Sequence, residues 1–120
     1  VLCGEVGIYV RRAPDTVRAA DVLFLSTERY RQVTSPSYLD VAPELVVEVL
    51  SPDDRWSDVM AKIYDYLEVG VDRVWVVDDK QRKVYSYRSL SRVEVFDRES
   101  SLEEPELLPG LRLDVGELFR

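Results

Sequence analysis

The stretch PELVVEVLSP, residues 43–52, combines the pattern of a buried strand with an acidic residue near its centre. Four aliphatic residues at 45, 46, 47 and 49 are typical of a strand covered on both faces, and such strands lie in the middle of α/β sheets. Glu48 interrupts this run. Burying an ionised side chain without a counter-charge costs several kcal/mol. Glu48 therefore needs a proton, a cationic partner, a metal ion or access to water.

A helix and a second apolar strand follow this stretch. Pro52 and the acidic residues after it suit a helix start, and Gly70 suits the residue that ends a helix. We therefore expect a helix from about Asp54 to Glu68 and a strand over 73–78. Two strands joined through a helix pair in parallel.

The remaining segments read as short strands. We expect strands over 6–10, 20–25, 83–88 and 92–96, a loop with one helical turn over 26–42, and a closing strand with a short helix over 107–119. The hairpins among them are antiparallel, whereas the strand–helix–strand unit is parallel. The sequence thus predicts an α/β fold with a mixed central sheet flanked by helices.

Length and composition limit the possible functions. The 120 residues suit one domain spanning 1–120. No apolar run reaches the roughly 20 residues needed to cross a bilayer, and with a single cysteine and no signal-like segment we expect a cytoplasmic protein without membrane contact. The absence of histidine excludes Ser-His-Asp and Cys-His triads. A net charge of −7 argues against general coating of nucleic acid.

Carboxylates and lysine remain as candidates for chemistry. Asp21 lies near the start of one predicted strand, Glu48 lies within the next, and Lys62 lies on the following helix beside an apolar stripe. Two carboxylates and a lysine suit metal-dependent phosphodiester hydrolysis, because carboxylate oxygens bind Mg²⁺ and a bound metal ion acidifies water. Lysine can orient that water or offset charge on the phosphate.

Several segments carry a resemblance to a known family. The segments ADVLFL (20–25), PELVVEVLSPDD (43–54), DVMAKIYDYLEVGV (58–71), VWVVD (74–78) and LLPGLRLD (107–114) resemble the Uma-type putative endonucleases of the PD-(D/E)XK superfamily. The resemblance covers nearly the whole chain. It implies a restriction endonuclease-like fold, a Mg²⁺ or Mn²⁺ cofactor and DNA as the substrate. It also implies that this chain lacks the N-terminal helix and first strand of the family.

The resemblance assigns roles to individual residues. Asp21 and Glu48 match the two acids of the motif, and the carbonyl of Val49 is expected as a further metal ligand. Leu50 stands where the superfamily usually has lysine, so Lys62 on the next helix is expected to supply that group. Ala20 replaces the usual proline before the first acid. Glu5 is a possible remnant of an additional acidic ligand.

Each of these residues also has a structural alternative. Glu48 can pair with an arginine such as Arg18 or Arg73, and Asp21 can cap a turn. Lys62 can form a surface ion pair with Asp58, four residues earlier on the helix. Tyr66, a possible accessory catalytic group, is more often a core aromatic residue.

Two further expectations concern partners. The main concentration of basic residues consists of Arg11, Arg12, Arg29 and Arg31. Arg11 and Arg12 are candidates for nucleic-acid binding, and the alternative is a solvated surface. The strands over 83–96 form an exposed meander whose edge a second copy could cover, which predicts a homodimer. The competing interpretation of the whole chain is a non-catalytic dimeric interaction module that keeps the nuclease fold.

Overall fold

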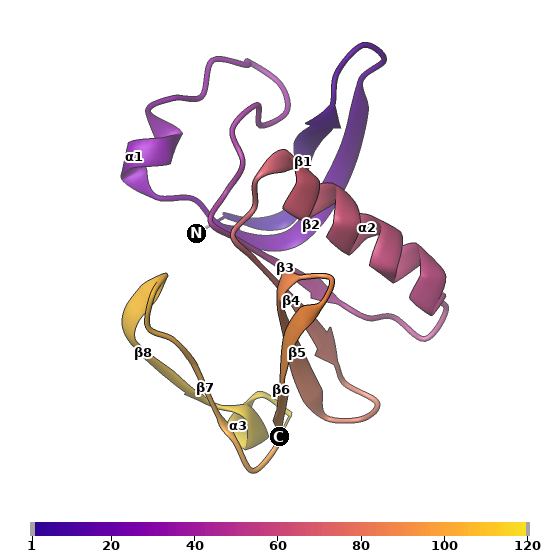
Figure 1. Cartoon of the computed structure of the whole chain (residues 1–120), viewed down its shortest axis with the longest axis vertical. Helices are drawn as coiled ribbons and strands as arrows, with labels where there is room; N and C mark the ends of the chain where they lie inside the picture. Colours follow the sequence, from indigo (N-terminus) through magenta and orange to yellow (C-terminus); the bar gives the residue numbers. More distant parts are fainter. Residues whose placement is uncertain (1, 120) are drawn as a thin grey trace.

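The computed structural model describes residues 2–119, with side chains from residue 6 onward. Its elements are β1 (Leu2–Arg11), β2 (Thr16–Phe24), α1 (Thr27–Tyr30), β3 (Leu45–Val49), α2 (Trp56–Val69), β4 (Arg73–Asp78), β5 (Lys83–Ser89), β6 (Arg92–Asp97), β7 (Ser101–Glu104), β8 (Leu108–Asp114) and α3 (Val115–Leu118) (Figure 1). Within residues 2–119, none of the helices has the length and apolar character of a membrane span.

Six strands form one mixed sheet. Their order is β1-β2-β3-β4-β5-β6, and β7 pairs with β8 in a separate two-stranded sheet. The strands β3 and β4, which α2 connects, are parallel, whereas the other neighbours in the large sheet are antiparallel. This arrangement confirms the predicted mixed sheet.

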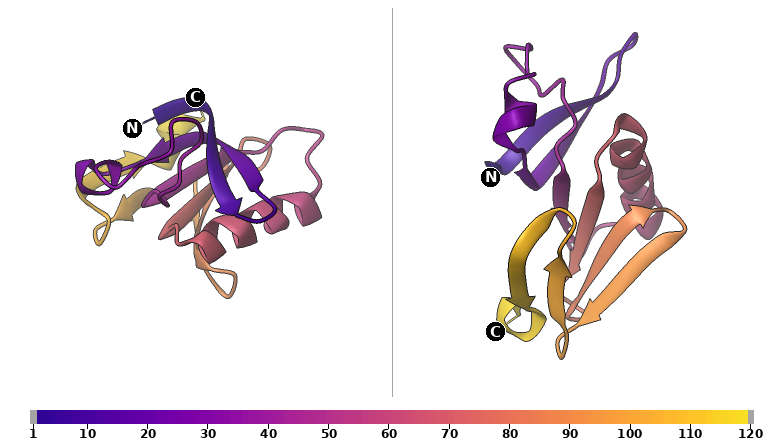
Figure 2. Two further views of the ribbon diagram at one scale, coloured as in Figure 1. Left: turned by 90° about the horizontal axis from the view of Figure 1, so that it is seen from above. Right: turned by 60° about the vertical axis from the view of Figure 1, so that its left-hand side comes forward.

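The two faces of the sheet have different covers. Helix α2 lies across one face, where Val59 and Ile63 pack with Val46 and other buried residues of the sheet. The β7–β8 hairpin and α3 cover part of the opposite face around Leu45, Trp75 and Val84 (Figure 2). Alternate residues of β3 therefore enter two different cores, as expected of a central strand.

The start of α2 differs from the prediction. The helix begins at Trp56, and its N-cap, Arg55, makes no side-chain capping bond. The Asp54 carboxylate instead accepts the backbone N–H of Ser51 at 2.7 Å, which holds residues 51–54 in a turn before the helix. The end of the helix is as predicted, because Gly70 adopts a left-handed conformation with φ 114°.

Three strands differ clearly from the prediction. β1 begins at Leu2 rather than at residue 6, and β2 begins at Thr16 rather than at residue 20, because the two segments pair in a long hairpin. β7 was not predicted, since Leu102 is the only apolar residue in that four-residue strand. The earlier start of β2 places Asp21 inside a strand and not near its start.

Candidate active site

Asp21 and Glu48 come from neighbouring strands of the large sheet. The antiparallel register of β2 and β3 pairs Val22 with Val47, so the next pair along the strands is Asp21 and Glu48. Directly opposite residues of an antiparallel pair lie on the same face of a sheet. One carboxylate oxygen of Asp21, Oδ2, accepts the backbone N–H of Val49 at 2.8 Å. The two acids therefore lie side by side, on inner strands rather than on an edge strand.

Helix α2 supplies the other groups around Glu48. The Glu48 residue is only 6% exposed. Its Oε1 accepts the hydroxyl of Tyr66 at 2.7 Å, and its Oε2 lies 3.4 Å from the Nζ of Lys62. Lys62 and Tyr66 are four residues apart, which places them one above the other on the same helix face. The helix thus brings one cation and one hydroxyl donor to the buried carboxylate.

The structural alternatives for Glu48 and Lys62 are wrong. Arg18 pairs with Asp65, and Arg73 pairs with Glu104 on the opposite face of the sheet. Lys62 pairs with Glu48 and makes no ion pair with Asp58 within the part of the chain that the structure describes. The partner of the buried acid is therefore the lysine on α2.

The surroundings of Glu48 disfavour its charged form. Burial raises the pKa of Glu48, and the neighbouring charge of Asp21 raises it further, although the Tyr66 hydroxyl and Lys62 act in the opposite direction. Burial and the charge of Glu48 also raise the pKa of Tyr66, so this tyrosine stays protonated as a hydrogen-bond donor. The single positive charge of Lys62 does not fully compensate the two negative charges of Asp21 and Glu48. An additional cation beside the two carboxylates would complete the compensation.

A β-bulge lies opposite Asp21. In the pairing of β1 with β2, Cys3 lies opposite Val22 but Val6 lies opposite Ala20. Two residues of β1, Gly4 and Glu5, therefore face the single residue Asp21. Bulges are frequent beside active sites, where they redirect side chains. The side chain of Glu5 lies outside the described ones, and its role as an accessory ligand stays a prediction.

The carboxylate pair fits a magnesium-type ion. Among the side chains that the structure describes, no group of three or more His, Cys, Asp or Glu residues could hold a metal ion. Mg²⁺ does not require such a group, because it is often bound by one or two carboxylates and keeps several waters. Asp21 and Glu48 provide oxygen ligands of this kind. The additional contribution of the Val49 carbonyl stays a prediction.

An unpredicted acid, Asp65, organises the basic residues near the site. Asp65 is buried on α2 and binds Arg11 at 2.7 Å and Arg18 at 2.8 Å. Both arginines come from the β1–β2 hairpin, so the pairs connect that hairpin to the helix that carries Lys62. Helical spacing does not mark Asp65, because at about 100° per residue it lies roughly 200° around the helix from Ile63 of the apolar stripe.

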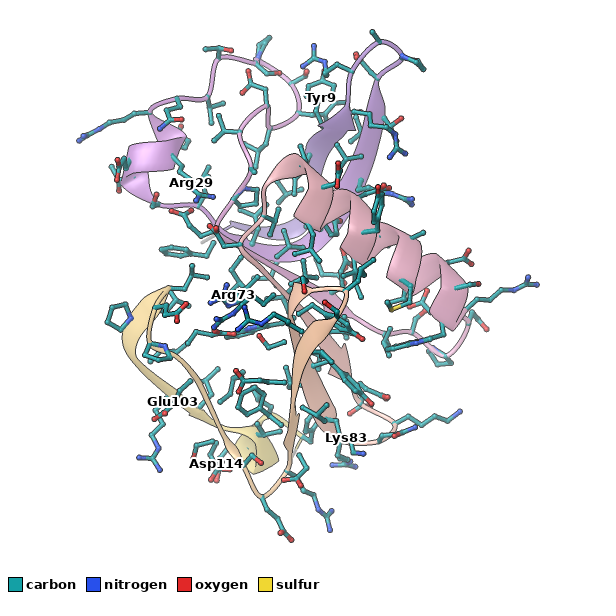
Figure 3. The ribbon with its side chains drawn as sticks, in the orientation of Figure 1. Tyr9, Arg29, Arg73, Lys83, Glu103 and Asp114 are labelled. Carbon is teal, nitrogen blue, oxygen red and sulfur yellow. The ribbon has the colours of Figure 1, made fainter. Side chains whose placement is uncertain are left out.

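Arg12 lies farther out on the same hairpin. Its guanidinium bonds Asp15 at 3.0 Å and stacks 3.9 Å above the ring of Tyr9, whose position Figure 3 shows. More than half of the side-chain surface of Arg11 and Arg12 remains exposed. Arg29 is bonded to Asp72 at 2.7 Å and to the backbone carbonyl of Ala42, and only 30% of its side chain is exposed. The exposed basic residues are therefore Arg11 and Arg12 on the hairpin and Arg31 after α1.

Comparisons with known proteins agree with this architecture. The chain matches the Uma2 family, described as putative restriction endonucleases, over residues 1–116. A putative nuclease belonging to DUF820 from Anabaena variabilis has a similar structure, with 25% sequence identity and a TM-score of 0.73. The similarity covers 88% of this chain but 62% of the cyanobacterial one, so this chain spans less than two thirds of its structural neighbour. No curated protein matches the sequence.

The family match and the structural neighbour confirm the predicted fold and the predicted relationship. The six-stranded mixed sheet with α2 is the restriction endonuclease-like architecture that the resemblance implied. The match extends over all the elements that carry Asp21, Glu48 and Lys62. This protein therefore belongs to the Uma2 family of putative restriction endonucleases.

Proposed function

We propose that this protein is a metal-dependent endonuclease that hydrolyses phosphodiester bonds of DNA. The observation that carries the proposal is the adjacency of Asp21 and Glu48 on one sheet face, with the Lys62 ammonium 3.4 Å from the Glu48 carboxylate. The family match and the cyanobacterial neighbour, itself described as a putative nuclease, support the same reaction class.

Each group has a distinct role in this proposal. Asp21 and Glu48 would hold Mg²⁺ or Mn²⁺, and the carbonyl of Val49 would add a further ligand. The ion, when bound, polarises the phosphate and lowers the pKa of a water molecule. Lys62 orients the attacking water or stabilises charge on the phosphate. The Tyr66 hydroxyl fixes the orientation of the Glu48 carboxylate through its 2.7 Å hydrogen bond.

The β1–β2 hairpin is the proposed contact to the DNA backbone. Arg11 and Arg12 are exposed there, and arginine suits bidentate contact with phosphate. The protein as a whole carries a net charge of −7, so general electrostatic attraction to DNA is weak. The exposed arginines of the β1–β2 hairpin would compensate for this negative charge locally, where the DNA binds.

Metal binding can be measured without any assay of activity. Adding Mn²⁺ or Mg²⁺ should raise the thermal unfolding midpoint of the wild type, because a ligand that binds only the folded state stabilises it. Glu48→Gln should abolish this increase, since it removes one of the two charged ligands. Glu68→Gln is the matched control, because Glu68 is an exposed acid on the same helix. An equal increase in Glu48→Gln would exclude Glu48 as a ligand.

The reaction is tested by plasmid nicking in the presence of Mn²⁺ or Mg²⁺. Lys62→Ala should reduce nicking by at least tenfold, whereas Lys80→Ala, at an exposed lysine in the β4–β5 turn, should leave it unchanged. Metal binding in the wild type without nicking would favour the alternative function, a non-catalytic interaction module with a retained metal site. Nicking that survives both Glu48→Gln and Lys62→Ala would overturn the proposed mechanism.

A further inference from the structure

Two arginines of the β1–β2 hairpin converge on one buried acid of α2. The side chain of Asp65 is only 5% exposed. Its Oδ1 accepts a hydrogen bond from Nη1 of Arg11 at 2.7 Å, and its Oδ2 accepts one from Nε of Arg18 at 2.8 Å, with Nη2 of Arg18 at the same distance. Both guanidinium groups are therefore anchored to a carboxylate that the helix itself holds in place.

This group of three residues keeps a positive charge and unused hydrogen-bond donors. Two guanidinium groups and one carboxylate leave a net charge of about +1 at neutral pH. A guanidinium has five N–H donors, and the bonds to Asp65 occupy only part of them. Among the side chains that the structure describes, neither arginine has another hydrogen-bond partner. Solvent reaches both, since 54% of the Arg11 side chain and 31% of the Arg18 side chain are exposed.

The two arginines lie beside the proposed metal site. Asp65 directly precedes Tyr66, whose hydroxyl binds Glu48 at 2.7 Å. Burial and the charge of Glu48 raise the pKa of Tyr66, whereas the charge of Arg18 acts to lower it, so Arg18 lies within electrostatic range of that hydroxyl. Arg18 and Asp21 belong to the same strand, β2, about 10 Å apart along it. Figure 1 shows the hairpin and α2 on the same part of the molecule.

Attachment of the hairpin to the helix explains only part of this arrangement. One arginine bonded to Asp65 would make that connection. A second arginine adds a like charge beside the first, and Asp65 balances only one of the two. Neither Arg11 nor Arg18 makes a second ion pair within the described side chains. A phosphate group would supply both the missing negative charge and oxygen acceptors of the geometry that arginine binds best.

We propose that Arg11 and Arg18, positioned by Asp65, form an arginine clamp for one phosphate of the DNA backbone, next to the phosphate at the metal site. This inference rests on the proposed function. Arg11 is already a proposed contact to DNA, whereas the phosphate contact of Arg18 and the positioning role of Asp65 are additional. The clamp binds through the free donors of both guanidinium groups, and Asp65 holds them at a fixed separation.

Binding of a labelled DNA duplex tests the clamp without any assay of activity. Fluorescence anisotropy over a range of salt concentrations, with Ca²⁺ in place of Mg²⁺ to limit hydrolysis, gives the affinity and its salt dependence. Arg11→Ala and Arg18→Ala should each weaken binding about tenfold and lower the slope of log affinity against log salt by about one. Arg18→Lys should keep the slope but weaken binding, because lysine lacks the planar fork. Arg98→Ala, at an exposed arginine after β6, is the control and should change neither quantity.

Asp65→Asn separates positioning from charge. Removing a negative charge near bound DNA should by itself leave binding unchanged or strengthen it, as expected for Glu68→Gln at an exposed acid on the same helix. Asp65→Asn should instead weaken binding, because both arginines lose their charged anchor. Circular dichroism at pH 7 should show that the compared variants are folded. Tighter binding by folded Asp65→Asn would overturn the positioning role.

Plasmid nicking separates failure of the clamp from failure of the proposed function. Arg18→Ala should raise KM and change kcat little, because the phosphate contact is the same in the bound substrate and in the transition state. Nicking by the wild type, together with unchanged DNA affinity of Arg11→Ala and Arg18→Ala, would overturn the clamp alone. DNA binding that depends on Arg18 and Asp65 without nicking would support the clamp and overturn the hydrolysis. A wild type that binds no DNA would overturn the clamp.

Discussion

Glu48 is a buried acid whose surroundings were partly predictable at the scale of single residues. The physical cost of an unpaired carboxylate in an apolar strand predicted a partner, and the helical spacing of Lys62 and Tyr66 placed both on one face. The structure brings both to the Glu48 carboxylate. The partners of Asp65 could not be predicted, because they lie on a hairpin 47 and 54 positions away in the sequence.

Asp65 should contribute stability that depends on pH. Burial acts to raise its pKa, but the hydrogen bonds and charges of Arg11 and Arg18 outweigh burial and lower the pKa below its ordinary value of 3.8. A carboxyl group with a lowered folded-state pKa stabilises the fold above its unfolded pKa, and this contribution is lost as the pH falls through the folded value. Asp65→Asn should therefore lower the free energy of unfolding at pH 7 by about 2 kcal/mol.

The test is urea unfolding of the wild type and Asp65→Asn at several pH values. The difference in the free energy of unfolding between the two proteins should be largest at pH 7 and should decrease below pH 4. Asp53→Asn, at an exposed acid before α2, should show little difference at any pH. A difference for Asp65→Asn that stays constant down to pH 2 would show that its ion pairs are not the cause.

At the scale of elements, strongly amphipathic or fully apolar segments were predicted well. The bounds of β4 agree with the sequence, and those of β5 and β6 differ by one residue at one end. β4 and β5 have clear patterns of burial, whereas β6 is exposed except for Phe96 and was recognised from the alternation of apolar and polar residues in its sequence. The start of α2 was misplaced by two residues, because Asp54 stabilises a preceding turn as readily as it would cap a helix. β7 was missed because tertiary packing of Leu102, and not local pattern, makes it a strand.

The left-handed end of α2 gives a prediction at this scale. Gly70 has φ 114°, and a methyl group added there would meet only the Cβ of Ala42 at 3.6 Å, an ordinary contact. The cost of Gly70→Ala is thus conformational and should be about 1–2 kcal/mol. Thermal unfolding should show a lower midpoint for Gly70→Ala and a smaller decrease for Gly70→Asn, because asparagine tolerates positive φ better. Equal midpoints for Gly70→Ala and the wild type would contradict this explanation.

At the scale of the whole molecule, a buried charge network connects the two sheets. Glu104 of β7 accepts the Trp75 indole N–H at 2.9 Å and lies 3.3 Å from the guanidinium of Arg73, both on β4. Figure 3 shows Arg73 between the large sheet and the β7–β8 hairpin. Trp75 belongs to the strand that the sequence predicts over 73–78, but the acid that it binds comes from an unpredicted strand 29 positions later. Long-range pairing of this kind leaves no local pattern.

Removing this network should destabilise the protein as a whole. Glu104→Ala leaves the buried Trp75 indole without its acceptor and removes one of the two carboxylates that bind Arg73. The expected loss is about 3–5 kcal/mol, a large part of the stability of a small domain. Glu103→Ala is the control, because the adjacent Glu103 is exposed and its closest cation is 4.0 Å away. Chemical denaturation measures both, and similar losses for the two variants would contradict a structural role of Glu104.

The place of β3 in the sheet has a geometric consequence. Glu48 lies three strands in from the edge at β6 and two strands in from the edge at β1. With neighbouring strands about 4.8 Å apart, it is about 14 Å from one edge and about 10 Å from the other. Glu48 is also the last residue but one of β3, and Val49 beside it is 49% exposed. A DNA strand that reaches the proposed metal site would therefore approach it past the carboxyl end of β3, and not across either edge of the sheet.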